Sequence, residues 1–212
     1  MSEQDTFKYF NTFDRNNYEW FEIIYNMYRK NDKYHSVHHV FSLLDRLEPL
    51  KKCVRNIEMI QAAIWFHDII YDPKRNDNEE KSKQVFQYYA GTRFSSYFID
   101  NVGMFIMCTK DHKLPEKDLD PHLLQDLKIF LDLDMSIFDT ESKEYSLYAY
   151  NIRREYEKTV PNYEEMRIKF LNSVLEKSNI FYTVYFKDEK ARENINWEID
   201  LLKSHLPKTE QN

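Results

Sequence analysis

Apolar residues recur at every third or fourth position along most of the chain, which is the spacing of amphipathic helices. The clearest stripes lie in residues 40–47, 57–67, 98–106 and 123–131. Further helices are expected over residues 141–158, 163–176 and 188–205, and residues 7–27 predict one interrupted helix or two short ones. This pattern predicts an all-α fold, a single-domain helical bundle.

Local signals define several helix ends. The stripe at residues 40–47 should end before Pro49, because the residue ahead of a proline avoids the α region. Asp77 and Glu80 have the spacing of a capping box for a helix that runs through Tyr89. Residues 57–67 are apolar on most sides, so this helix is expected at the centre of the bundle.

Composition supports one helical domain over residues 1–212. The 212 residues include only two glycines and six prolines, which leaves few of the breakers that tight turns in sheet-rich folds use. We expect core motifs at about residues 34–140, C-terminal helices over 141–206 and a frayed tail over 207–212.

Charge and hydropathy narrow the classes of partner. The net charge is −6 and acidic and basic residues are interspersed, so no stable nucleic-acid complex is expected. No apolar run reaches the length that spans a bilayer, and residues 1–16 lack an apolar signal core. The expectation is a cytoplasmic protein without a membrane partner; the oligomeric state cannot be read from the pattern.

A histidine and an aspartate interrupt an otherwise apolar segment. His67 and Asp68 lie within residues 62–71, in the helix expected at the centre. Burying an ionised carboxylate without a partner costs several kcal/mol, on the order of 3–5, so a cation or tight hydrogen bonds should accompany Asp68. A metal site and an internal His–Asp hydrogen bond are both consistent with the pattern.

Other candidate ligands have suitable helical spacing. His35 and His39 are four residues apart, which places both on one face of a helix. Asp134 continues the apolar face of its helix and is expected to point inward, whereas Asp132 falls on a more polar face and is the weaker candidate. Two imidazoles and two carboxylates suit Mn, Fe, Co, Ni or Zn better than Ca.

These segments together resemble the HD superfamily and, within it, a group of small predicted metal-dependent phosphohydrolases. The resemblance rests on Tyr34 to His39, Trp65 to Pro73, Asp77-Asn78-Glu79 with Ser82, Leu131 to Asp134, Thr109 with His112, Arg154-Glu155-Tyr156, and Ala191-Arg192 with Asn194. It implies an HD-type helical bundle in which His39, His67, Asp68 and Asp134 bind one divalent ion, which is Mn, Fe, Co, Ni, Zn or Mg. Phe138-Asp139 departs from the family pattern, where a small residue is expected.

The resemblance implies hydrolysis of a phosphate ester or anhydride in a small phosphorylated molecule, such as a nucleotide, by metal-activated water. Asp68 is the candidate that orients the attacking oxygen. His112 is a candidate second-metal ligand, phosphate contact or general acid, and Glu79 is a candidate for holding a metal-bound water. For His112 an exposed loop position, and for Glu79 a place in the first turn of a helix, are the alternatives.

Three further residues are candidates for substrate binding. His35 is a candidate for contacting substrate or orienting His39, Tyr71 for stacking on a base, and Arg154 for pairing with a phosphate. A structural ion pair near Glu155 is the favoured alternative for Arg154. Two rival classes remain open: a catalytically weak metal- or nucleotide-binding regulator of HD type, and a helical interaction module with a buried His–Asp hydrogen bond.

Overall fold

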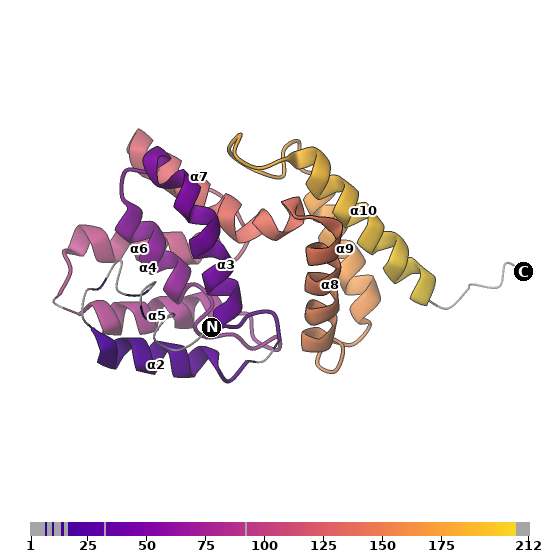
Figure 1. Ribbon diagram of the computed structural model, residues 1–212, viewed down its shortest axis with the longest axis horizontal. Coiled ribbons are helices and arrows are strands. Elements are labelled where there is room, and N and C mark those ends of the chain that lie inside the picture. Colours follow the sequence, from indigo (N-terminus) through magenta and orange to yellow (C-terminus); the bar gives the residue numbers. More distant parts are fainter. Residues whose placement is uncertain are drawn as a thin grey trace, which may run out of the picture. The chain divides into compact units, whose positions relative to one another are not determined.

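The computed structural model describes residues 7, 10, 14, 17–31, 33–91 and 93–206, and these residues form an all-α protein (Figure 1). Among them are nine α-helices, two 3-10 helices and no strand, as the helical periodicity predicts. The chain divides into two compact units, Met1–Asp134 and Met135–Asn212. The expectation of a single domain over residues 1–212 stays a prediction.

The first unit contains most of the helices. They are α2 (Tyr18–Tyr28), α3 (Val37–Leu47), η1 (Glu48–Cys53), α4 (Ile57–Phe66), α5 (Asn78–Ala90), α6 (Ser96–Cys108) and α7 (Pro121–Met135), whose last residue belongs to the second unit. Helix α3 ends two residues before Pro49, as expected. The expected break within residues 7–27 falls partly outside the described residues, and so does the expected tail at 207–212.

Helix α4 lies at the centre of the first unit, as its apolar sequence predicts. Every side chain from Met59 to Phe66 is buried, and α6 packs against both α4 and α5 (Figure 1). Trp65 contacts the rings of Phe10, Phe21 and Phe41 edge-on. This dense apolar packing fixes the end of α4, where His67 follows.

A carboxylate of α7 caps the start of α4. The Asp126 side chain is buried, and its two oxygens accept hydrogen bonds from the backbone N–H groups of Arg55 and Asn56, each at 2.8 Å. Asn56 itself makes no capping bond with its side chain, so Asp126 supplies the acceptor that the helix start needs. Asp134 lies eight residues further along α7, about 12 Å by helical rise, and meets His67 at the other end of α4. The two helices therefore run parallel.

The capping box expected for α5 is wrong. Helix α5 does begin after Asp77, but this side chain makes no capping bond and pairs with Arg75 at 2.7 Å. The Glu80 carboxylate accepts from Lys110 Nζ at 2.8 Å instead of reaching back to the helix start. Competing cations therefore hold both carboxylates that the motif would need.

The second unit contains η2 (Ser136–Asp139), α8 (Ser142–Tyr156), α9 (Tyr163–Leu175) and α10 (Asp188–His205), and α10 packs against the other three. Figure 1 shows these helices in orange to yellow. The bounds of α10 are those that the sequence predicts. Phe138 is buried, and its carbonyl and that of Thr140 accept from Asn194 Nδ2 at 2.9 and 2.8 Å. A large side chain thus fits where the family pattern expects a small one.

A buried ion pair lies inside the second unit. Arg167 on α9 donates to both oxygens of Glu198 on α10, at 2.8 and 3.1 Å, and Tyr145 OH donates to Glu198 at 2.6 Å. Arg167 also donates to Tyr148 OH at 3.0 Å. Every charge in this cluster has an opposite partner, which is the condition for burying ions.

In the part of the chain that the structure describes, none of the helices combines the length and the apolar character that a membrane crossing requires.

Candidate metal centre

Three side chains from three helical regions of the first unit meet at one point. His39 lies in α3, His67 directly follows α4, and Asp134 is the penultimate residue of α7. The Nε2 atoms of the two histidines are 3.3 Å apart, and each lies 3.3 Å from Asp134 Oδ1. These residues form a group that can hold a metal ion.

The backbone sets which nitrogen of His67 faces this group. Its Nδ1 lies 3.0 Å from the carbonyl oxygen of Ile64, one turn earlier in α4. A carbonyl oxygen only accepts hydrogen bonds, so Nδ1 carries a proton and donates it. In the neutral imidazole, Nε2 then presents a lone pair to His39 and Asp134, which is the arrangement of a metal-ligating histidine.

The spacing of the three atoms fits an ion. In four- and six-coordinate sites with bonds of about 2.1 Å, neighbouring ligand atoms lie about 3.0–3.4 Å apart. The three separations of 3.3 Å fall in this range. Two imidazole nitrogens and one carboxylate oxygen favour a transition metal over Ca²⁺.

Asp68 lies at the edge of this group, as its place after His67 predicts. One of its oxygens is 3.0 Å from His67 Nε2 and 3.8 Å from His39 Nε2. Its side chain is 14% exposed, so it borders both the histidines and the surface. Its role as a fourth ligand stays a prediction.

His112 reaches the same carboxylate from the loop between α6 and α7. Its Nε2 lies 2.9 Å from Asp134 Oδ2, the oxygen that does not face His39 and His67. Its backbone has a φ of 48°, in the left-handed region that non-glycine residues adopt at a cost of about 1–3 kcal/mol. His112 is therefore a partly buried loop residue that contacts Asp134, and not the exposed loop histidine of the alternative. Its role as ligand, phosphate contact or general acid stays a prediction.

The titration of the group reflects two opposed forces. Burial disfavours the charged form of His67, but the negative charges of Asp68 and Asp134 outweigh burial and raise its pKa well above the usual value. Burial would raise the pKa of Asp134, yet His67, His112 and His39 hold it well below its usual range. For His39 burial prevails and lowers the pKa. His39 is therefore neutral and ready to ligate at neutral pH.

His35 and His39 do not share a helix face, so this expectation is wrong. His35 lies in the turn before α3, which begins at Val37. The His35 ring stacks on Tyr71 with centroids 3.6 Å apart, and its Nε2 is 4.0 Å from Asp68. The Tyr71 ring thus contacts a histidine in the position where stacking on a base was expected. His38 is exposed, as expected of a surface residue.

The remaining candidates lie in different surroundings. Glu79 is half-buried in the first turn of α5, and burial together with the charge of Asp68 raises its pKa. Asp132 is buried, so its expected place on a more polar face is wrong. It is not part of the metal-binding group, in agreement with the prediction that it is the weaker ligand candidate. Arg154 belongs to the second unit, where its guanidinium lies 5.9 Å from the centre of the Tyr150 ring. Its predicted phosphate contact stays a prediction.

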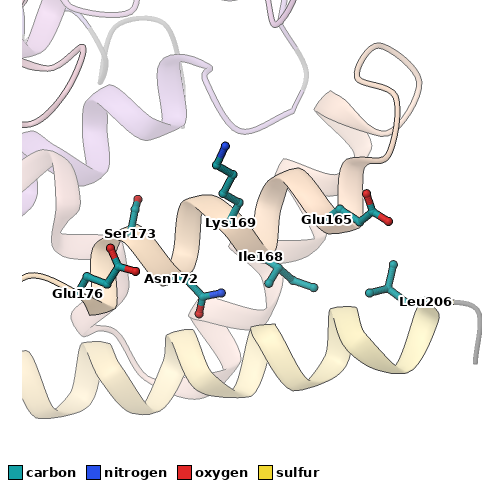
Figure 2. A pocket seen from close by; sticks show the side chains of 7 residues that line it. All are labelled: Glu165, Ile168, Lys169, Asn172, Ser173, Glu176 and Leu206. Atoms are coloured by element: carbon teal, nitrogen blue, oxygen red, sulfur yellow. The ribbon is translucent and has the colours of Figure 1, made fainter. Parts of the chain in front are cut away.

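A groove of about 510 Å³ is present in the second unit (Figure 2). It lies beside α9 and is lined by Glu165, Ile168, Lys169, Asn172, Ser173, Glu176 and Leu206. None of these side chains belongs to the group around His67. The groove contains no histidine and no cluster of ligand types, so it offers no comparable chemistry.

Asn78, Ser82 and Lys110 have no role predicted from the sequence, yet the structure places them around the loop that follows His67-Asp68. Asn78 and Ser82 bind backbone groups of this loop, and Lys110 Nζ donates to the carbonyl of Asn76 at 2.8 Å. The four-residue spacing of Asn78 and Ser82 was the available signal, because it places both on one helix face.

No family model, no curated protein and no solved structure matches the chain. The interpretation of the site therefore rests on its own geometry and on the motifs in the sequence.

Proposed function

We propose that this protein is a divalent-metal-dependent phosphohydrolase of the HD type that acts on a small phosphorylated molecule. The observation that carries the proposal is the convergence of His39, His67 and Asp134 at mutual distances of 3.3 Å, with Asp68 alongside. The motifs around these residues resemble the HD superfamily, which supports the same assignment.

A metal ion satisfies this arrangement better than a proton does. With Nδ1 of His67 donating to a carbonyl, the neutral ring directs an unshared pair at His39 Nε2 and at two carboxylates. One proton on His67 Nε2 satisfies one of these neighbours, whereas one metal ion satisfies all of them. This favours a metal site over the simple His–Asp hydrogen bond of the helical-module alternative.

A bound ion would lower the pKa of a water and polarise a phosphoryl oxygen. Asp68 borders the surface within reach of both histidines, so it would accept a hydrogen bond from the attacking water and orient it. His112, whose Nε2 lies 2.9 Å from Asp134 Oδ2, is the residue that would donate a proton to the leaving oxygen. Half-buried Glu79, whose pKa is raised by burial and by the charge of Asp68, is the proposed holder of a further water.

The substrate class follows from the groups at the edge of the site. The imidazoles of His35 and His112 would donate hydrogen bonds to phosphate oxygens. The ring of Tyr71, which stacks on His35, offers a flat apolar edge. A phosphate ester or anhydride with a planar group, such as a nucleotide, matches this combination.

The test measures metal content and hydrolysis in the same preparations. Wild type and the variants His39→Gln, His67→Gln and Asp134→Asn are supplied with Mn²⁺, Fe²⁺, Co²⁺, Ni²⁺ or Zn²⁺, desalted and analysed by mass spectrometry. Hydrolysis is then followed with bis-p-nitrophenyl phosphate and a nucleotide panel, with Mg²⁺ as a further added ion. His38→Gln is the matched control, because His38 is exposed on the same helix as His39.

We expect about one ion per chain in wild type and in His38→Gln. In each of the other variants we expect the affinity for the metal to fall at least about a hundredfold and hydrolysis to be lost with it. Wild type that takes up none of these ions would overturn the metal site and favour the helical module. Metal uptake without hydrolysis of any substrate in the panel would favour the regulator.

A further inference from the structure

Two side chains of α5, Asn78 and Ser82, form hydrogen bonds to the backbone on either side of Tyr71, and we call this pair the clamp. Ser82 Oγ accepts from the N–H of Ile70 at 3.2 Å and lies 3.3 Å from the carbonyl of Ile70, to which it donates. Asn78 Oδ1 accepts from the N–H of Asp72 at 3.1 Å, and its Nδ2 donates to the Asp72 carbonyl at 3.0 Å. Both backbone groups of both flanking residues are thus bound.

Both side chains of the clamp are buried, although the loop to which they bind has no regular secondary structure. Ser82 is 0% exposed and Asn78 is 8% exposed, whereas residues 71–77 contain no helix or strand. The two side chains are four residues apart in α5, so one face of a rigid helix supplies all four bonds. A loop held in this way has a fixed backbone at Tyr71 instead of several conformations.

The fixed residue contacts the edge of the candidate metal centre. The Tyr71 ring lies parallel to the His35 ring, at an interplanar angle of 18° and a centroid distance of 3.6 Å. His35 is not held by a helix, since it precedes α3, and its Nε2 is 4.0 Å from Asp68. The stacked Tyr71 ring therefore covers one face of the imidazole beside Asp68.

We propose that Asn78 and Ser82 are positioning residues that hold Tyr71 against His35 and thereby orient His35 beside Asp68. The expected effect on hydrolysis rests on the proposed phosphohydrolase function, whereas the expected orientation of His35 does not. Neither side chain touches the metal-binding group, so the clamp acts on how substrate meets His35 and leaves ion binding intact.

The structural arm of the test uses the ring protons of His35 in NMR spectra of the full chain with Zn²⁺. A stacked tyrosine shifts these resonances upfield, and His35→Gln identifies them by their disappearance. Tyr71→Leu removes the ring and gives the full downfield shift, whereas Tyr71→Phe keeps the ring and should leave the resonances in place. The test variants are Asn78→Ala, Ser82→Ala and the double variant, with the milder Asn78→Asp and Ser82→Thr in case the double variant does not fold.

Asn101→Ala is the matched control, because Asn101 is a buried asparagine of α6 whose side chain donates to the Tyr97 carbonyl, away from the clamp. We expect the double variant to show at least half of the Tyr71→Leu shift and the control to show none. Asn78→Asp removes the donor to Asp72 but keeps an acceptor, so it should shift less than Asn78→Ala. Ser82→Thr keeps the hydroxyl and should restore the wild-type position.

The kinetic arm compares kcat/KM with the dissociation constant of Mn²⁺. We expect the double variant to lose about tenfold in kcat/KM while the Mn²⁺ dissociation constant stays within about twofold of wild type. His35 resonances that do not move in folded clamp variants, or that move equally in Asn101→Ala, would overturn the inference. If no preparation hydrolyses a phosphate substrate, the NMR measurement still tests the positioning role of Asn78 and Ser82. If the clamp variants keep full hydrolysis and their His35 resonances do not move, the positioning role is overturned and the proposed phosphohydrolase function stands.

Discussion

The two units of this protein bury charge in opposite ways. In the second unit, Arg167 and Glu198 satisfy each other through two hydrogen bonds, and Tyr145 and Tyr148 complete the cluster. In the first unit, His39, His67 and two carboxylates converge on one point with no cationic side chain of arginine or lysine among them. In the second unit the side chains neutralise one another, so the cluster is structural. In the first unit a bound metal ion would neutralise the carboxylates.

Breaking the pair of Arg167 and Glu198 should have the largest effect on stability. Arg167→Met leaves Glu198 buried without its counter-ion, so the free energy of unfolding should fall by about 3–5 kcal/mol in urea titrations. Removing both charges with Arg167→Met and Glu198→Leu should cost less than Arg167→Met alone, because no ion is then stranded. A double variant that is less stable than the single one would contradict this account of the pair.

For the group around His67, we instead expect stability and metal binding to depend on pH. In the metal-free protein the raised pKa of His67 means that its charged form contributes stability below the unfolded value of about 6.5, and that this contribution is lost as pH rises through the folded pKa. The lowered pKa values of Asp68 and Asp134 contribute above about 3.8, and their contributions are lost as pH falls through the folded values. An ion must displace the His67 proton, while His39 with its lowered pKa has none to release at neutral pH.

Metal binding at pH 7 should therefore release about one proton per ion, and affinity should fall about tenfold per pH unit, or about 1.4 kcal/mol, as pH decreases below the His67 pKa. Calorimetric titrations in two buffers with different heats of ionisation measure the released proton. Release of two protons would show that His39 is charged before the ion binds, contrary to its burial. His38→Gln should behave as wild type.

The smallest expected effect concerns the link between α4 and α7. Asp126→Ala removes the acceptor for the N–H groups of Arg55 and Asn56 at the start of α4, and loss of a helix cap costs about 1 kcal/mol. Urea unfolding measures this loss, and Asp126→Asn should retain part of the stability because its amide oxygen still accepts. Metal affinity should change less than in Asp134→Asn, because Asp126 does not contact the group around His67. An unchanged stability in Asp126→Ala would show that the cap is dispensable.

The sequence alone determined the helical class and most helix positions, because the period of apolar residues depends only on local geometry. It also pointed to His67, Asp68 and Asp134, since charged residues within apolar stripes are costly without a partner, whereas His39 was singled out by the resemblance to the HD superfamily. The metal, the substrate and the family stay predictions from these motifs.

Tertiary structure decided what no local pattern contains. Only the parallel packing of α4 and α7, joined at one end by Asp126, brings Asp134 rather than buried Asp132 to His67. Long-range contacts also pair Glu80 with Lys110 and stack His35 on Tyr71. Each of these outcomes depends on partners 30 or more residues away along the chain, where the period of a single helix carries no information.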